Sequence, residues 1–354
     1  MTTTTTGSMM STTVTTTTVT TTTTTTTTTT VTTTTVTTTT TTTVTTITTA
    51  TPICGSTCVN TSISTLSRVA FYSFDSTTTD ATGNYSASGI SSPTYVTGWV
   101  GSAISFTASN AQRLSTAYIP LNLRTFTIDF WFYATDVNST INFAFVGECT
   151  TQKTDLCLFI NIHKRVLFFG FFNDDTAGNT TVSPNQWYHA AFVFDNSTLK
   201  QYIYMNGLLV GRTSANLLQT TSGPFTIGGA TIGGNTNLYV YYSGYIDHLT
   251  ISYRAKTACE IYLNAALACY FPFDSNAPLL DSGPNFLTAI NTGATSVIGR
   301  VNQAWAFTSS LSYILISGIS AMLPQYNVFT ISTWINPTSV TGGATLIHCA
   351  SLAN

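Results

Sequence analysis

The chain has 354 residues, a net charge of −2 and only 7% charged residues, although 43% of its residues are hydrophobic. So little positive charge excludes a basic patch that could neutralise phosphates, and we expect no nucleic acid partner. Apolar runs such as VLFFGFF, Val166–Phe172, are far shorter than the roughly 18 residues of a membrane span, so none is expected.

Residues 1–52 form a threonine-rich tract, with 38 threonines among residues 1–51. Threonine supplies no apolar face to bury, so we expect this tract to be disordered. Such runs are typical of O-glycosylated stalks, although an unmodified low-complexity repeat has the same composition. Met1 is followed by threonines rather than by an apolar segment, so the sequence predicts no signal peptide in this chain.

Residues 53–67 are expected to be a linker that carries the first two of seven cysteines. Cys149 and Cys157 bracket a polar turn between two apolar runs, a spacing that lets a disulfide join adjacent strands. The others lack the spacing of zinc ligands, so we expect structural disulfides of an oxidising compartment, with the pairing left open. These other predicted disulfide cysteines are Cys54, Cys58, Cys259 and Cys269.

Five N-x-S/T sequons lie in or just before the first globular segment, and they predict N-glycosylation. A chain rich in asparagine, serine and threonine produces some sequons by chance, but their density favours a secreted protein. The predicted glycosylation sites are Asn60, Asn84, Asn138, Asn179 and Asn196.

The first globular segment, residues 68–264, alternates with the period of a β-strand. In FTIDFWFYA (126–134), Ile128, Phe130 and Phe132 share one face. Another strand is predicted at 187–195, and Asn206-Gly207 is the pair that a type I′ hairpin turn prefers. A helical pattern is confined to TACEIYLNAAL (257–267). The sequence therefore predicts an all-β fold, an antiparallel two-sheet jelly-roll sandwich.

Motifs of the first segment return in the same order roughly 200 residues later. FTIDFWFYAT is followed by FTISTWINPT, AFYSFD by CYFPFD, and GWVGSAISF by GRVNQAWAF. Ordered repetition at a nearly constant spacing indicates a duplicated domain. Residues 265–354 are therefore interpreted as a second copy that ends before its later strands, which leaves Cys349 as the counterpart of Cys149.

FTIDFWFYAT, NQWYHAAFVFDNSTLKQYIYMNGLLVG and GYIDHLTISYRAKTACEIY together resemble the laminin G-like branch of the concanavalin A-like lectin/glucanase superfamily. The resemblance covers the first copy and the opening strands of the second. It implies a jelly-roll sandwich with the concanavalin A-like topology. One departure is that Thr107 and Ala108 follow Phe106, where the family often carries Asp-Gly.

Catalysis is not expected, because glycoside hydrolysis needs two neighbouring carboxyl groups. The chain has only two glutamates, Glu148 and Glu260, and neither lies in the E-x-D-x-x-E pattern of the enzymes. Asp174 and Asp175 are adjacent, but neighbours on a strand point to opposite faces. The four histidines are expected to be structural or surface residues.

The resemblance also implies a possible calcium ion, because laminin G-like domains often hold one. Asp75, Asp80 and Asp247 match acidic positions of the family and are candidate ligands, although turn capping is the alternative role. For sugar stacking the candidates are Tyr239, Tyr241 and Tyr242, unless these tyrosines only cover the sheet.

We therefore expect a non-catalytic extracellular or cell-surface protein that recognises glycans or extracellular glycoproteins. Two alternatives stay open. The repeated sandwiches could be spacers without a ligand, or they could be accessory binding modules of a larger carbohydrate-active enzyme. This step from fold to function rests on analogy, since one fold serves many functions.

Overall fold

The computed structural model describes residues 23–29, 32–38, 61–138, 140–149, 151–231, 239–274, 276–319, 329–339 and 345–349. The chain divides into two compact units, residues 1–50 and residues 51–354. Cys54, Cys58 and Asn60 lie outside the described residues, and so does most of the threonine-rich tract.

Within the tract, two threonine-rich segments pair as antiparallel strands. Strand β1 (Thr23–Thr29) pairs antiparallel with β2 (Thr32–Thr38). The prediction of disorder does not describe these fourteen positions, where the high strand propensity of threonine agrees with the observed pairing. The rest of that prediction falls outside the described residues.

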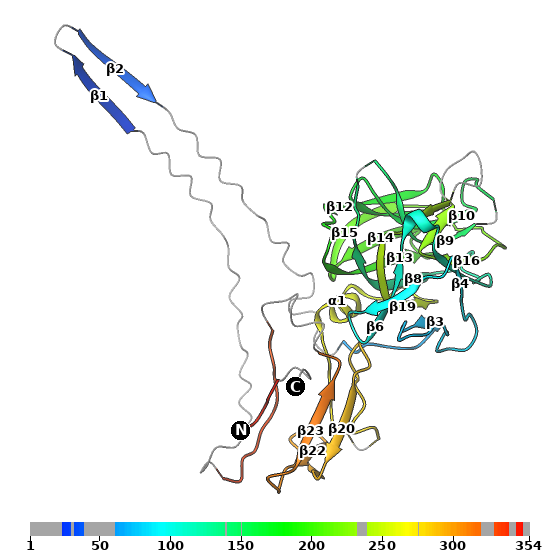
Figure 1. Ribbon diagram of the computed structural model, residues 1–354, viewed down its shortest axis with the longest axis vertical. Coiled ribbons are helices and arrows are strands. Elements are labelled where there is room, and N and C mark those ends of the chain that lie inside the picture. The colour runs from blue at the N-terminus through cyan, green and yellow to red at the C-terminus, as the bar shows by residue number, and fades with distance from the viewer. Residues whose placement is uncertain are drawn as a thin grey trace, which may run out of the picture. The chain divides into compact units, whose positions relative to one another are not determined.

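The second unit contains two antiparallel sheets packed face to face, as the sequence predicted (Figure 1). The seven-stranded sheet has the order β12 (Asp175–Thr181), β11 (Val166–Gly170), β10 (Cys157–His163), β9 (Phe143–Cys149), β16 (Phe225–Ile227), β7 (Arg113–Thr116) and β4 (Ser88–Ile90). The eight-stranded sheet has the order β15 (Leu208–Ser214), β14 (Lys200–Met205), β13 (Trp187–Asp195), β8 (Phe126–Ala134), β19 (Gly244–Ser252), β6 (Ser102–Phe106) and β5 (Thr94–Thr97), with β3 (Arg68–Tyr72) also paired to β19.

The core lies between the two sheets and is rich in phenylalanine. Ile128, Phe130 and Phe132 point into it from β8, as their alternation predicted. Phe130 packs against Phe145 of the opposite sheet, with ring centroids 5.1 Å apart. Burying a large apolar side chain contributes about 2 kcal/mol, so this layer supplies most of the stabilisation of the sandwich.

The predicted hairpin at Asn206-Gly207 is confirmed. Asn206 has φ +49° and Gly207 has φ +80°, and the two residues connect β14 to β15. A Cβ on Gly207 would lie 2.8 Å from the Tyr262 backbone, so the turn also requires glycine for close packing.

The other face of the eight-stranded sheet is covered rather than solvated. Helix α1 (Ala258–Ala266) begins with a capping box between Thr257 and Glu260 and places Ile261 against Ala191 and Val193 of β13. The helix lies within the predicted 257–267 segment. Beside it, Trp99 stacks on Trp131 with centroids 3.8 Å apart.

The C-terminal segment completes this cover. Leu287 is buried among the tryptophans of the outer face, and Phe271 and Ile316 pack against the same group. The segment forms two two-stranded sheets, β20 (Thr288–Thr292) with β23 (Tyr313–Ser317) and β21 (Thr295–Ile298) with β22 (Gln303–Ala306).

The pairing in this segment follows that of the first copy. Thr97 pairs with Ser102 between β5 and β6, and Ile298 pairs with Gln303 between β21 and β22. Strand β4 pairs with β7 as β20 pairs with β23. The common pairing order agrees with the interpretation of residues 265–354 as a second copy, which stays a prediction.

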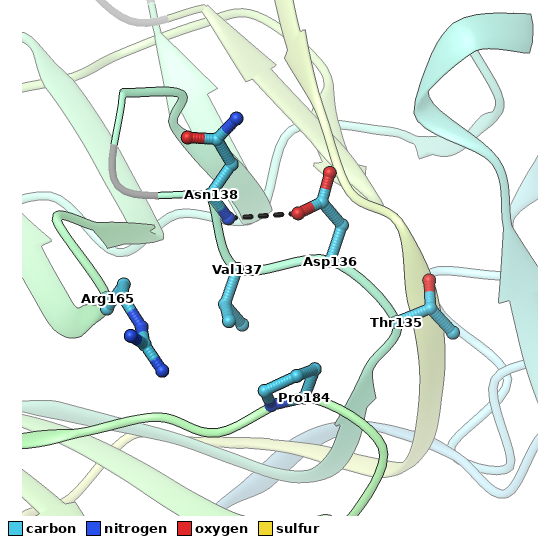
Figure 2. Close-up of a pocket in the computed structure, with 6 residues that line it drawn as sticks. All are labelled: Thr135, Asp136, Val137, Asn138, Arg165 and Pro184. Atoms are coloured by element: carbon cyan, nitrogen blue, oxygen red, sulfur yellow. Dashed lines mark hydrogen bonds between the residues drawn. The ribbon is translucent and has the colours of Figure 1, made fainter.

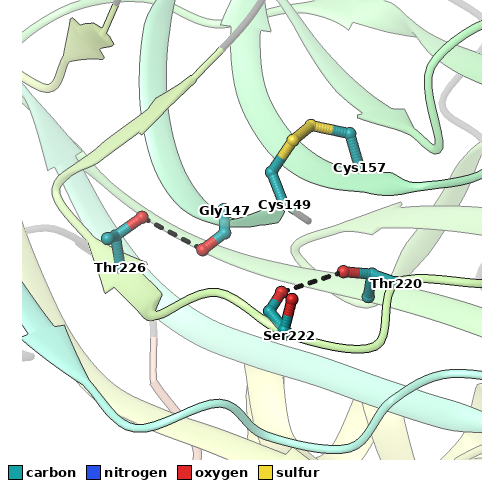
Figure 3. Close-up of a disulfide and its surroundings, with 6 residues drawn as sticks. All are labelled: Gly147, Cys149, Cys157, Thr220, Ser222 and Thr226. Atoms are coloured by element: carbon teal, nitrogen blue, oxygen red, sulfur yellow. Dashed lines mark hydrogen bonds between the residues drawn. A yellow bond between two sulfur atoms is a disulfide. The ribbon is translucent and has the colours of Figure 1, made fainter. Parts of the chain in front are cut away.

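The predicted disulfide between Cys149 and Cys157 is present and joins directly opposed residues of β9 and β10 (Figure 3). Their Cα atoms are 4.1 Å apart. Beside it, the Thr226 hydroxyl donates to the Gly147 carbonyl at 3.0 Å, tying β16 to β9. This disulfide links the end of β9 covalently to the start of β10.

The prediction for the remaining cysteines is wrong in one respect. Cys259 is disulfide-bonded, but Cys269 is a free thiol packed in the partly buried layer beside the tryptophans. The two cysteines therefore do not pair with each other. Cys269 packs instead as a small apolar side chain, a common role for a free cysteine.

Candidate functional site

A pocket with a volume of about 400 Å³ lies at one end of the sandwich (Figure 2). Three connections meet there: the loop from β8 to β9, the turn from β10 to β11, and the segment from β12 to β13. We call this the end pocket, and it is lined by Thr135, Asp136, Val137, Asn138, Arg165 and Pro184.

The first wall of the end pocket is held by local side-chain hydrogen bonds. The Asn138 backbone N–H donates to Asp136 Oδ1 at 2.9 Å (Figure 2). The Thr140 N–H and hydroxyl both donate to Asn138 Oδ1, at 3.0 and 2.9 Å. Such turns fix the loop without secondary structure, while Val137 is buried and anchors it to the core.

The opposite wall comes from a two-residue turn of unusual composition. Lys164 and Arg165 connect β10 to β11, and their φ angles are +49° and +67°. A type I′ turn has this backbone and strongly prefers Asn-Gly, because β-carbons clash in the left-handed region. Each such residue stores about 1 kcal/mol or more of strain, which is typical of functional sites.

The end pocket therefore presents a carboxylate, an amide and a guanidinium around two small apolar surfaces. Asp136, Asn138 and Arg165 are all exposed. Its lining has one carboxyl group and no histidine or cysteine. This set can accept and donate several hydrogen bonds, and it offers no general acid and base pair.

The candidate tyrosines separate into two environments. Tyr239 and Tyr241 lie on β18 (Tyr239–Tyr241), half-buried and stacked with centroids 6.0 Å apart. The guanidinium of Arg113 lies 4.6 Å from the centroid of the Tyr239 ring and 5.8 Å from that of the Tyr241 ring. The Arg113 guanidinium therefore occupies one face of this tyrosine pair through cation–π contacts.

The prediction that Tyr242 lies on a ligand-binding surface is wrong. Tyr242 is fully buried against Phe145, with centroids 4.8 Å apart. Tyr242 lies in the connection between β18, which ends at Tyr241, and β19, which begins at Gly244. The chain turns inward there, so the Tyr242 side chain enters the core.

The candidate calcium ligands do not form one group. Asp80 is buried, and both of its oxygens accept backbone donors from residues 71, 82, 84 and 85 at 2.9 to 3.1 Å. Asp75 and Asp247 instead hold the turn at Gly98–Ser102: Ser102 N–H donates to Asp75 at 2.9 Å, and Val100 N–H donates to Asp247 at 3.0 Å.

The surroundings of these aspartates fit N–H groups better than a cation. Gly101 has φ +59°, and a Cβ there would lie 2.1 Å from Asp75 Oδ1, so the carboxylate closes on the backbone itself. Asp247 is fully buried, and its Oδ1 is hydrogen-bonded to His248 Nδ1 at 2.9 Å. Burial raises the pKa of the Asp247 carboxyl. Within the described ranges no group of three or more histidine, cysteine, aspartate or glutamate side chains could hold a metal ion.

Both glutamates accept hydrogen bonds from other parts of the fold. Glu260 caps α1 and accepts two bonds from Arg254, at 2.7 and 2.8 Å. Glu148 is buried in β9 and accepts from the Ile119 N–H at 2.8 Å, and burial raises the pKa of its carboxyl to about 8. Sequence analysis missed this shift because the cover over β9 comes from distant segments.

The described sequons differ in how their asparagines are used. Asn84, Asn138 and Asn179 are exposed, whereas Asn196 is half-buried and donates its amide to the Leu123 carbonyl at 3.1 Å. Glycosylation at these positions stays a prediction. No helix among the described residues is long and apolar enough to cross a membrane.

Comparison with known proteins supports the family expectation for the first sandwich. Residues 106–262 match the Laminin_G_3 family model, described as the concanavalin A-like lectin/glucanases superfamily. The matched segment is a laminin G-like domain. The match does not extend to the C-terminal segment, so a second copy is not confirmed, and no curated protein matches the chain.

Solved structures similar to the laminin G-like domain are distant in sequence. Domain 4 of an extracellular GH43 arabinanase from Geobacillus stearothermophilus is 18% identical, with 55% of this chain and 96% of that domain covered and a TM-score of 0.45. The botulinum neurotoxin serotype C1 binding domain is 13% identical, with 58% and 53% covered and a TM-score of 0.46.

A third similar structure is the binding domain of Paraclostridial Mosquitocidal Protein 1, which is 17% identical, with 71% of this chain and 64% of that chain covered and a TM-score of 0.47. The aligned part thus spans about half to two thirds of the toxin binding domains.

Proposed function

We propose that the laminin G-like domain is a non-catalytic recognition domain that binds glycans in the end pocket. The observation that carries this proposal is the lining of that pocket, in which Asp136, Asn138 and Arg165 surround Val137 and Pro184. A volume of about 400 Å³ lies within the range of ligand-binding pockets.

The chemistry of this lining suits a sugar. A saccharide presents hydroxyl groups that both donate and accept, together with small apolar patches of C–H groups. Asp136 supplies an acceptor, Arg165 supplies donors and Asn138 supplies its side-chain N–H donors, since Asn138 Oδ1 already accepts two bonds from Thr140. Pro184 offers apolar contact. The strained Lys164-Arg165 turn supports this assignment, because a functional role accounts for residues that stability alone disfavours.

The proposed location is extracellular or at the cell surface. The Cys149–Cys157 disulfide supports it, because disulfides persist in oxidising compartments. Sequons on the exposed surface outside the end pocket, at Asn84 and Asn179, support it as well. The partners would then be glycans or extracellular glycoproteins.

The test is binding of the purified chain to a panel of immobilised glycans, with and without calcium. We expect binding to at least one glycan class, and a loss of about tenfold or more in affinity for Asp136→Asn and Arg165→Ala, since each removes one charge-assisted hydrogen bond. Arg212→Ala on β15 is the control, because Arg212 is also exposed but does not line the end pocket.

The calcium arm tests the predicted ion separately. Binding that disappears in a chelator and returns with calcium would support a role for the ion, against the geometry of Asp75, Asp80 and Asp247. Equal binding in both conditions would favour the hydrogen-bonding role of these aspartates.

A spacer function is the second candidate, and one observation favours it. The C-terminal segment packs tightly on the outer face of the eight-stranded sheet through Phe271, Leu287 and Ile316, which stiffens the connection between successive modules. A spacer would bind no glycan in either calcium condition, so the same panel separates the two functions.

A further inference from the structure

A small, partly enclosed cavity of about 30 Å³ lies on the outer face of the eight-stranded sheet, and none of its lining residues lines the end pocket. It is walled by β3, β8, β13, β19 and α1, and residues 284–286 of the C-terminal segment cover it. We call it the buried cavity. Its lining is largely polar and includes Asp129, His189, Lys256 and Asn264.

Asp129 fixes the orientation of its neighbours. Its carboxylate accepts from Lys256 Nζ at 2.6 Å and from Asn264 Nδ2 at 3.4 Å, and His189 Nε2 lies 3.7 Å from it. Because the nitrogens of Asn264 and His189 face the carboxylate, Asn264 Oδ1 and His189 Nδ1 are turned away from it. Both of these atoms are buried and have no hydrogen-bond partner among the described residues.

Arg68 contributes a third buried polar atom that has no hydrogen-bond partner among the described residues. Its guanidinium lies over the rings of both Phe71 and Phe286, 4.7 and 5.0 Å from their centroids. The Nε–H of Arg68 is buried and, in the part of the chain that the structure describes, has no acceptor. The lining of the buried cavity therefore carries one fixed donor and two acceptors whose hydrogen bonds are unmade.

We propose that the buried cavity binds an ordered water molecule that bridges Arg68, His189 and Asn264. A water accepts from Arg68 Nε and donates to Asn264 Oδ1 and His189 Nδ1, which matches the usual three hydrogen bonds of an internal water. If His189 is doubly protonated, a water still fits by accepting two bonds and donating one. The volume exceeds the roughly 10 to 15 Å³ that one water requires.

The same donors and acceptors argue against an ion. A chloride would place negative charge against the Asn264 carbonyl oxygen, and a sodium ion would lie against the Arg68 guanidinium. Water is the small species that satisfies both kinds of group at once. A polar group left buried without a partner costs about 1 to 3 kcal/mol, so filling the site stabilises the closed arrangement.

This water would tie together segments that are distant in sequence. Arg68 belongs to β3, His189 to β13 and Asn264 to α1, while Phe286 of the C-terminal segment closes over Arg68. The bridge therefore extends the attachment of the C-terminal segment beyond the apolar contact of Leu287 with the tryptophans.

The test is a high-resolution crystal structure of the full chain from crystals grown in sodium bromide. We expect one density peak within hydrogen-bond distance of Arg68 Nε, His189 Nδ1 and Asn264 Oδ1, without anomalous signal from bromine. An anomalous peak would show an anion site, and an absence of density would show a dry cavity; either result overturns the proposal.

Two variants separate hydrogen bonding from charge. His189→Phe removes one acceptor and fills space, and it should eliminate the peak. Lys256→Met leaves the three bridging atoms in place, so the peak should persist. Loss of the peak in Lys256→Met with retention in His189→Phe would contradict a water held by these atoms. Neither result depends on glycan binding.

Discussion

Lys256 Nζ lies 2.6 Å from Asp129 Oδ2, and both side chains are buried on the outer face of the eight-stranded sheet. Burial alone would raise the pKa of the Asp129 carboxyl, but the Lys256 ammonium and His189 hold it down to about 2. The carboxylate therefore stays ionised in the interior across the physiological range.

Replacing one partner of this ion pair should destabilise the fold. Lys256→Met leaves the Asp129 carboxylate buried without its cation, and we expect a loss of about 3 to 5 kcal/mol in the free energy of unfolding by chemical denaturation. Asp129→Asn with Lys256→Met together should cost less than Lys256→Met alone, because no buried charge is left unpaired. A double variant as unstable as the single one would contradict this.

The same pair predicts a loss of stability in acid. The folded pKa of Asp129, about 2, lies below its ordinary value of 3.8, so its contribution is present above pH 3.8 and is lost as the pH falls towards 2. The difference corresponds to about 2 kcal/mol. Denaturation of the unmodified chain between pH 5 and 2 measures it, and the Asp129→Asn variant should lack this component of the acid transition.

Glu148 predicts the opposite trend at higher pH. Burial raises its pKa from 4.5 to about 8 in the folded state, so its stabilising contribution is complete below pH 4.5 and is lost as the pH rises through 8. Glu148→Gln keeps a neutral acceptor for the Ile119 N–H and should raise the stability at pH 8 by about 4 kcal/mol. Thermal unfolding at pH 5 and pH 8 checks this, since the variant should be far less sensitive to pH than the unmodified chain.

The Lys164-Arg165 turn is expected to lower the stability of the fold while it supports glycan binding. Lys164→Asn with Arg165→Gly supplies the residues that a type I′ turn prefers, and we expect a gain of about 1 to 2 kcal/mol in stability together with weaker glycan binding. Denaturation and glycan-panel binding measure the two effects. As a comparison, Lys164→Asn alone keeps Arg165 in the end pocket and should retain most of the binding.

Reduction of the Cys149–Cys157 bridge should cost moderate stability. The two cysteines are 8 positions apart in the sequence, and closing so short a loop is worth about 2 to 3 kcal/mol by chain entropy. Cys149→Ser with Cys157→Ser should lower the midpoint of unfolding to the same degree as a reductant that opens this bridge. Cys269→Ser is the control, since that thiol is free.

Local pattern predicted the sandwich well. The alternation at 126–134 and 187–195 gave the strands β8 and β13 with their observed bounds, because the period of a strand follows from backbone geometry. Asn206-Gly207 predicted its turn for the same reason: the required φ angles select the residue types. Lys164-Arg165 could not be predicted as a turn, since nothing in that pair favours a positive φ.

The cover on the outer face could not be read from the sequence either. Asp129 and Trp131 alternate with the core residues, so the pattern alone suggests a solvated face, but both are buried by α1 and the C-terminal segment. That packing joins residues more than a hundred positions apart. The end pocket was missed for a related reason, because its three connections are brought together only when the strands pair.

Eight of the 24 charged side chains lie buried: Asp80, Asp129, Glu148, Asp155, Asp247, Lys256, Glu260 and Asp281. The exterior is left with few charges to attract or repel a partner over distance. Ionic strength should consequently change the rate of encounter with a neutral ligand very little, because screening acts only on charges that reach solvent. Recognition of a neutral ligand by this chain should depend on short-range fit, and its rate should be similar at low and at high ionic strength.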